Sequence, residues 1–120
     1  KGGKMMMSWE QNLMRETLET ANEYIEKMIE GIGSFNSYML NNEPSKALEL
    51  WPNILEGLEW IVQAVSLTKP IQEKDMNVEE LIEKLPDLLD AYENGDMILV
   101  SDILDYEIKP VLQKWVCQLH

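Results

Sequence analysis

The 120-residue sequence contains few of the residues that most often carry chemistry. It has one cysteine, Cys117, and one histidine, His120. A single cysteine excludes a disulfide within the chain and gives no sign of an oxidising compartment. One histidine at the last position excludes the pair of Glu-x-x-His motifs that builds a di-iron centre in a helical bundle. We therefore expect no cofactor, no metal and no catalytic residue, and we interpret the protein as a non-enzyme.

Basic residues are also scarce. Ten Lys and Arg stand against 22 Asp and Glu, which gives a formal net charge of −12. This charge repels phosphate backbones and anionic lipid, so we expect no nucleic-acid partner and no membrane partner. No apolar run reaches the roughly 18 residues of a transmembrane helix, and the first residues lack the apolar core of a signal peptide. These features favour a cytoplasmic protein whose charge serves solubility or attracts a basic partner.

Turn-forming residues are few, with six glycines and five prolines, whereas 45% of the residues are apolar and helix formers dominate. This composition predicts an all-α fold, and the chain is long enough for one hydrophobic core. We expect residues 1–7 to be a disordered or cloning-derived leader, with the native start at one of the methionines at positions 5 to 7. Residues 8–120 are expected to form a single helical-bundle domain.

Apolar residues recur at steps of three and four in four segments, which is typical of amphipathic helices. The predicted helices cover residues 9–41, 45–68, 77–94 and 96–118. Because the connections are short, we expect an antiparallel four-helix bundle. Asn77 and Glu80 match a capping box for the third helix, and Asp96 is placed to cap the fourth directly after Gly95.

Glycine and proline interrupt these predicted helices. Gly31 and Gly33 predict a kink or break in the first helix, because glycine is unfavourable in a helix interior. Pro52, Pro86 and Pro110 fall within the second, third and fourth helices and predict kinked or split helices. Gly57 would allow another helix to approach the second one closely.

Trp60 and Leu67 lie on the opposite side of the second helix from its main apolar stripe. One interpretation, which we favour slightly, is that this helix is buried on all sides. The other is an exposed patch that binds a partner or a second copy. Together with Tyr106, which lies on a second apolar stripe of the fourth helix, these two residues form the predicted interaction surface.

Glu107 is the one carboxylate that falls on an apolar row of the fourth helix, with Val100 and Leu104. This position predicts a partly buried carboxylate that needs a partner or reaches water with its head. Residues 90–101 are superficially similar to a calcium-binding loop. However, Tyr92 and Ser101 occupy positions where that loop needs oxygen ligands and a glutamate, so a capped turn between helices is the better interpretation.

The string Asp102-Ile-Leu-Asp-Tyr-Glu-Ile108, followed by Pro110, resembles a segment of small uncharacterised all-helical proteins of Gram-positive bacteria. In those proteins an Asp-Leu-Leu-Glu-Tyr-Glu-Leu-like string is closed by proline. The resemblance implies a helical bundle and supplies no catalytic residue. At the level of fold alone, the chain is also similar to flagellar export chaperones, small acidic bundles that hold a helical client.

These observations lead to three functional hypotheses. The first is a protein–protein interaction or chaperone-like module that holds a basic or amphipathic helix of another protein. The second is a structural module that forms a homodimer, through the overhanging part of the first helix or the Trp60 face. The third, and least favoured, is a bundle that binds a small molecule or metal between its helices.

Overall fold

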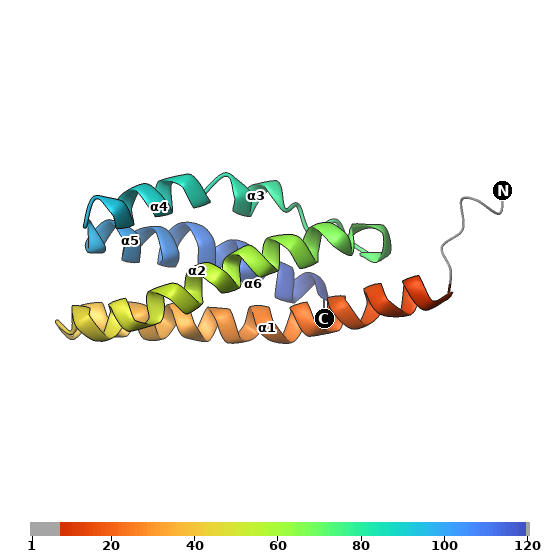
Figure 1. Cartoon of the computed structure of the whole chain (residues 1–120), viewed down its shortest axis with the longest axis horizontal. Coiled ribbons are helices and arrows are strands. Elements are labelled where there is room, and N and C mark those ends of the chain that lie inside the picture. Colours follow the sequence, from red (N-terminus) through yellow and green to blue (C-terminus); the bar gives the residue numbers. More distant parts are fainter. Residues whose placement is uncertain (1–7, 120) are drawn as a thin grey trace.

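The computed structural model describes residues 8–119, and this part of the chain is helical apart from its turns. The elements in chain order are α1 (Ser8–Leu40), α2 (Pro44–Leu67), η2 (Lys69–Ile71), α3 (Glu79–Ile82), α4 (Leu85–Glu93), α5 (Met97–Ile103), η3 (Leu104–Ile108) and α6 (Lys109–Leu119). These elements form four rods, namely α1, α2, the pair α3–α4, and the continuous α5–η3–α6. Figure 1 shows how they lie side by side. The prediction of an all-α, antiparallel four-helix bundle is confirmed. The expected leader, residues 1–7, and His120 lie outside the described residues.

Two tight turns join neighbouring rods as their residue types predict. Asn42 has a φ of 60° after α1, and Pro44 then occupies the first position of α2. Gly95 has a φ of 72° after α4, a backbone conformation that glycine adopts without steric cost. The side chain of Asp96 accepts a hydrogen bond of 3.1 Å from the backbone N–H of Leu99, so the predicted cap of α5 is confirmed.

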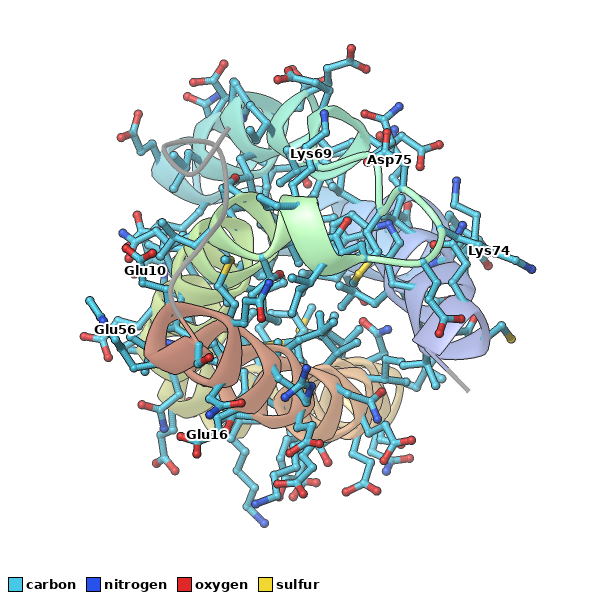
Figure 2. The ribbon with its side chains drawn as sticks, turned by 90° about the vertical axis from the view of Figure 1, so that its right-hand side faces the viewer. Glu10, Glu16, Glu56, Lys69, Lys74 and Asp75 are labelled. Carbon is cyan, nitrogen blue, oxygen red and sulfur yellow. The ribbon has the colours of Figure 1, made fainter. Side chains whose placement is uncertain are left out.

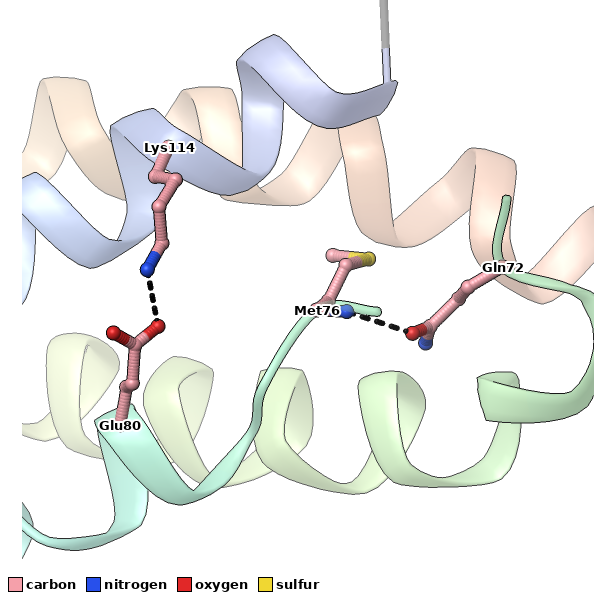
Figure 3. A network of polar contacts seen from close by, with 4 residues as sticks. All are labelled: Gln72, Met76, Glu80 and Lys114. Carbon is pink, nitrogen blue, oxygen red and sulfur yellow. Dashed lines mark hydrogen bonds and ion pairs between the residues drawn. The ribbon is translucent and has the colours of Figure 1, made fainter. Parts of the chain in front are cut away.

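The longer connection between α2 and α3 is held by side chains (Figure 3). The amide of Gln72 donates to the carbonyl of Val65 at 2.8 Å and accepts from the backbone N–H of Met76 at 3.1 Å. Met76 itself is buried in the core. Beyond it, the carboxylate of Glu80 pairs with Lys114 of α6, as Figure 3 also shows. The connection is therefore fixed both to α2 and to the fourth rod.

The predicted capping box at the start of the third rod is wrong. The helix begins at Glu79, and no side chain caps it. Asn77 instead accepts the backbone N–H of Glu80 through its main-chain carbonyl, in a turn. The Glu80 carboxylate is engaged by Lys114, so it does not fold back onto its own helix.

The core lies between all four rods. Trp51 of α2 stacks on Tyr92 of α4 with ring centroids 4.4 Å apart, which joins the second rod to the third. The largest fully buried side chains of the core include Trp115, Phe35, Ile25, Ile32, Leu58, Ile61, Leu81, Leu88, Leu104, Ile108 and Leu112. All of them except Leu112 lie on the apolar stripes that predicted the helices.

The structure interrupts only some of the helices where glycine or proline predicted it. α2 runs from Pro44 to Leu67 without a break at Pro52, so the predicted split is wrong there. α1 continues unbroken through Gly31 and Gly33, so the predicted break is wrong. Each glycine costs only about 1 kcal/mol, and the apolar face stays in phase and packed on both sides of them. Pro86 splits the third rod, since two turn residues separate Ile82 from Leu85.

Pro110 acts on the residues before it. The backbone N–H of Lys109 donates to the carbonyl of Leu104, five residues earlier, which makes η3 a π-helical segment. Proline has no N–H for the carbonyl of Tyr106, and in a regular helix its ring would collide with that carbonyl. The wider turn of η3 therefore accommodates Pro110 without breaking the rod.

Candidate functional site

α1 and α2 pack closely where Gly57 faces α1. A methyl group at Gly57 would lie 2.2 Å from Cε of Met28 and 2.6 Å from the hydroxyl of Tyr24. The predicted close approach at this glycine is confirmed. One turn further along α2, Trp60 packs its ring edge-on to Tyr24, with centroids 5.3 Å apart and an interplanar angle of 70°.

The outer side of this helix pair carries exposed apolar side chains that no described residue covers. Trp60 is 36% exposed despite its contact with Tyr24, and Leu67 is 69% exposed. The interpretation that α2 is buried on all sides is therefore wrong for this face. Trp60 and Leu67 are seven residues apart and hence share one face of α2.

The same surface continues along α1. Trp9 and Leu13 are exposed, and successive steps of four, four, three and four lead from Trp9 through Leu13, Thr17 and Thr20 to Tyr24 on one helix face. Figure 1 shows that the first turns of α1 extend beyond the other helices. Since the two helices are antiparallel, Leu67 lies closer to this extension of α1 than Trp60 does. We call the surface formed by Trp9, Leu13, Tyr24, Trp60 and Leu67 the α1–α2 seam.

A shallow hollow of about 140 Å³ opens at the other end of the seam. Its lining is mostly apolar, and Gly31 helps to form it because no atom lies within 4 Å of the position that a methyl group would take. The lining residues are Tyr24, Lys27, Met28, Gly31, Leu50, Asn53 and Ile54. The hollow could receive one apolar side chain of a bound segment.

Acidic side chains border the seam on both helices. On α1 they repeat every seven residues, and on α2 they stand beside Trp60; all are exposed. They are Glu16, Glu23, Glu30, Glu56 and Glu59. Figure 2 shows Glu16 and Glu56 projecting outward from their helices, away from the core. Lys27 is the one cation among the described residues that line the hollow.

Tyr106 does not join Trp60 and Leu67. It is 73% exposed and lies on η3, beside a different groove that the end of α1 forms with α5. The three predicted surface residues are therefore exposed, but they belong to two separate surfaces.

Glu107 is exposed, so the prediction of a partly buried carboxylate is wrong. That prediction assumed regular α-helical spacing between Leu104 and Val111. The π-helical segment rotates the following residues, and Ile108 enters the core while Glu107 points outward.

The other kinds of site considered from the sequence are not assembled among residues 8–119. Residues 90–101 form the end of α4, a turn and the start of α5, which confirms the interpretation as a helix-to-helix turn. Within the described part of the chain, no group of three or more His, Cys, Asp or Glu side chains is placed to hold a metal ion. Cys117 is an exposed free thiol. None of the described helices combines the length and apolar character needed to cross a bilayer.

A family model described as "Domain of unknown function (DUF8042)" matches residues 16–118. The chain belongs to this family. The DUF8042 match contains Tyr24, Trp60 and Leu67, whereas Trp9 and Leu13 precede it. No curated protein and no solved structure matches the chain.

Two parts of the seam were not identified from the sequence of this DUF8042 domain. Leu13 and Trp9 are spaced four residues apart, off the core stripe of α1, and this spacing could have indicated a second apolar face. The hollow at Gly31, which lies next to the seam, had no such signal, because it depends on how residues of α1 and α2 pack against one another.

Proposed function

We propose that the protein is a non-enzymatic, cytoplasmic interaction module that holds an amphipathic helix with basic flanks along the α1–α2 seam. The observation that carries this proposal is an apolar strip without a covering element among the described residues, bordered by exposed glutamates on both sides. An amphipathic helix lying along this strip would bury Trp60, Leu67 and Leu13.

The dimensions support a helical occupant. From Trp9 to Gly31 the seam follows 22 residue steps of α1, which is about 33 Å at 1.5 Å per residue. A partner helix of about six turns would match that length. Trp60 is well placed as an anchor, because partly buried tryptophans with a packed neighbour often dominate binding energy.

Charge favours another protein over a second copy. A homodimer through this seam would bring the glutamate rows of two chains together, and juxtaposed like charges are costly at an interface. A helix with lysine or arginine on both flanks would meet those rows favourably, and its association would be faster at low salt.

The test uses two synthetic helical peptides with the same leucine-rich face, one flanked by lysines and the other by glutamates. Isothermal titration calorimetry with the full chain should show that the lysine peptide binds, and that added salt weakens it. Trp60→Ala should weaken this binding by about tenfold or more. Leu99→Ala is the matched control, because Leu99 is an exposed apolar residue on α5, outside the seam.

Three results would overturn the proposal. The first is equal affinity for the lysine and glutamate peptides, the second is unchanged affinity of Trp60→Ala with its helical circular dichroism intact, and the third concerns the oligomeric state. Light scattering on the free protein should give a monomer. A dimer that Trp60→Ala dissociates would assign the seam to a second copy instead.

A further inference from the structure

A second surface lies at the opposite end of α1 from its N-terminal extension. Here the last turns of α1 meet α5 and η3 along a groove of about 250 Å³. The groove is lined by Asn36, Met39, Leu40, Ile98, Ser101, Asp102, Asp105 and Tyr106. A hydrogen bond of 2.6 Å from the hydroxyl of Ser101 to the side-chain oxygen of Asn36 joins the two walls.

The apolar side chains of this groove are unusually open to solvent. Leu40 is 88% exposed, Ile98 is 72% exposed and Tyr106 is 73% exposed. They come from α1, α5 and η3, so the exposed area is shared by three elements. Neighbouring exposed apolar groups with a polar border are typical of a binding surface.

One carboxylate stands between two of these side chains. Ile98, Asp102 and Tyr106 follow one another at steps of four, which places Asp102 beside both on the helix surface. Asp102 forms no ion pair within residues 8–119. Its neighbour Asp105 is bound to Lys109 at 2.6 Å, so Asp102 is the carboxylate available to an external cation.

We propose that this groove is a second docking site, which binds a partner segment carrying an arginine next to an apolar residue. The apolar residue would pack on Leu40 and Ile98. The guanidinium group would bond to both oxygens of Asp102 and stack on the ring of Tyr106. Arginine fits better than lysine, because its planar group can bond a carboxylate in bidentate fashion and stack on an aromatic face at once.

The π-helical segment contributes to this arrangement. η3 carries the core residue Ile108, and on the outer surface it carries Tyr106. Single π-helical turns within α-helices frequently occur at functional sites. The groove shares α1 with the seam but none of the five residues that define it, so this proposal stands independently of the proposed function.

The test is a titration followed by ¹H–¹⁵N NMR with the full chain. The probe is a short acetylated and amidated peptide that contains two leucines, two alanines and one arginine, compared with the same peptide containing citrulline or lysine. We expect the arginine peptide to shift the amide signals of Asn36, Ile98, Ser101 and Asp102. The citrulline peptide should bind at least about fivefold more weakly, and the lysine peptide should fall between them.

Three substitutions of exposed residues complete the test. Asp102→Asn and Tyr106→Ala should each weaken the arginine peptide by about fivefold or more, because each removes one of the two contacts of the guanidinium group. Tyr106→Phe should retain most of the affinity, since it keeps the ring. Glu107→Gln, which neutralises an exposed carboxylate next to Tyr106, is the control and should bind as the original chain does.

The proposal is overturned if the arginine peptide shifts signals elsewhere, or if Asp102→Asn binds it as tightly as the original chain does. Equal weakening by Asp102→Asn and Glu107→Gln would also overturn it, because that would indicate a general effect of negative charge. Trp60 lies outside this groove, so Trp60→Ala should leave the binding of the arginine peptide unchanged while it weakens the peptide designed for the seam. The two proposals therefore fail separately.

Discussion

At the scale of single residues, the glycines of α1 and α2 differ in what surrounds them. Close packing favours glycine at position 57, because any side chain there would meet Met28 and Tyr24. Gly31 and Gly33 have no neighbouring atom within 4 Å of an added methyl group. Glycine at those two positions therefore weakens the helix without enabling a close packing contact.

Substitution to alanine should separate these cases. Gly31→Ala and Gly33→Ala should each raise the free energy of unfolding by about 0.5–1 kcal/mol, because alanine favours the helix. Gly57→Ala should lower it, since overpacking costs typically about 1–3 kcal/mol and outweighs the same helical gain. Urea unfolding followed by circular dichroism measures all three. A stabilised Gly57→Ala variant would show that Met28 and Tyr24 move aside at little cost.

At the scale of elements, regular spacing explains what the sequence could predict. The four rods, the cap at Asp96 and the split at Pro86 all depend on local patterns, and the structure confirms them. Glu107 was misplaced because its assignment assumed a uniform helix, whereas the hydrogen bond from Lys109 to Leu104 adds a residue to one turn. The exposure of Leu67 was likewise not encoded locally, because periodicity identifies a face but not what covers it.

The two prolines inside unbroken helical rods should therefore respond differently to replacement. Pro52 lies in α2 with no π-helical turn around it, so Pro52→Ala restores a hydrogen bond and removes a steric conflict. We expect it to stabilise the protein by up to about 3 kcal/mol. Pro110→Ala should change the free energy of unfolding by less than about 1 kcal/mol, because η3 already accommodates the ring and proline restricts the unfolded chain.

Urea unfolding of both variants under the same conditions tests this comparison. Similar gains at the two positions would show that η3 does not relieve the conflict at Pro110. The amide of residue 109 gives a second measure by hydrogen exchange. It should stay protected in Pro110→Ala if core packing on both sides, by Leu104 and Leu112, maintains the π-helical turn.

At the scale of the whole molecule, the main electrostatic feature is the excess of acidic over basic side chains. The formal charge is −12, and the ion pairs among the described residues include Lys46–Glu43, Lys109–Asp105 and Lys114–Glu80. The Glu43 carboxylate, through a hydrogen bond and its charge, raises the pKa of Lys46, and the side chain of this lysine is exposed. Lys46–Glu43 and Lys114–Glu80 are largely exposed and Lys109–Asp105 is half-buried. Such surface pairs contribute little to stability, so repulsion between carboxylates should decide how stability depends on salt.

Added sodium chloride should therefore stabilise the protein. Screening of like charges should raise the melting temperature by about 3–5 °C between low and roughly 0.5 M salt, which corresponds to about 1 kcal/mol for a domain of this size. Circular dichroism melting curves measure the effect. Sodium sulfate at equal ionic strength is the control, because any additional rise in that salt reports its exclusion from the protein surface and not screening. A falling melting temperature in sodium chloride would mean that attraction within the three ion pairs outweighs the repulsion, and it would remove the electrostatic reason for expecting a basic partner at the seam.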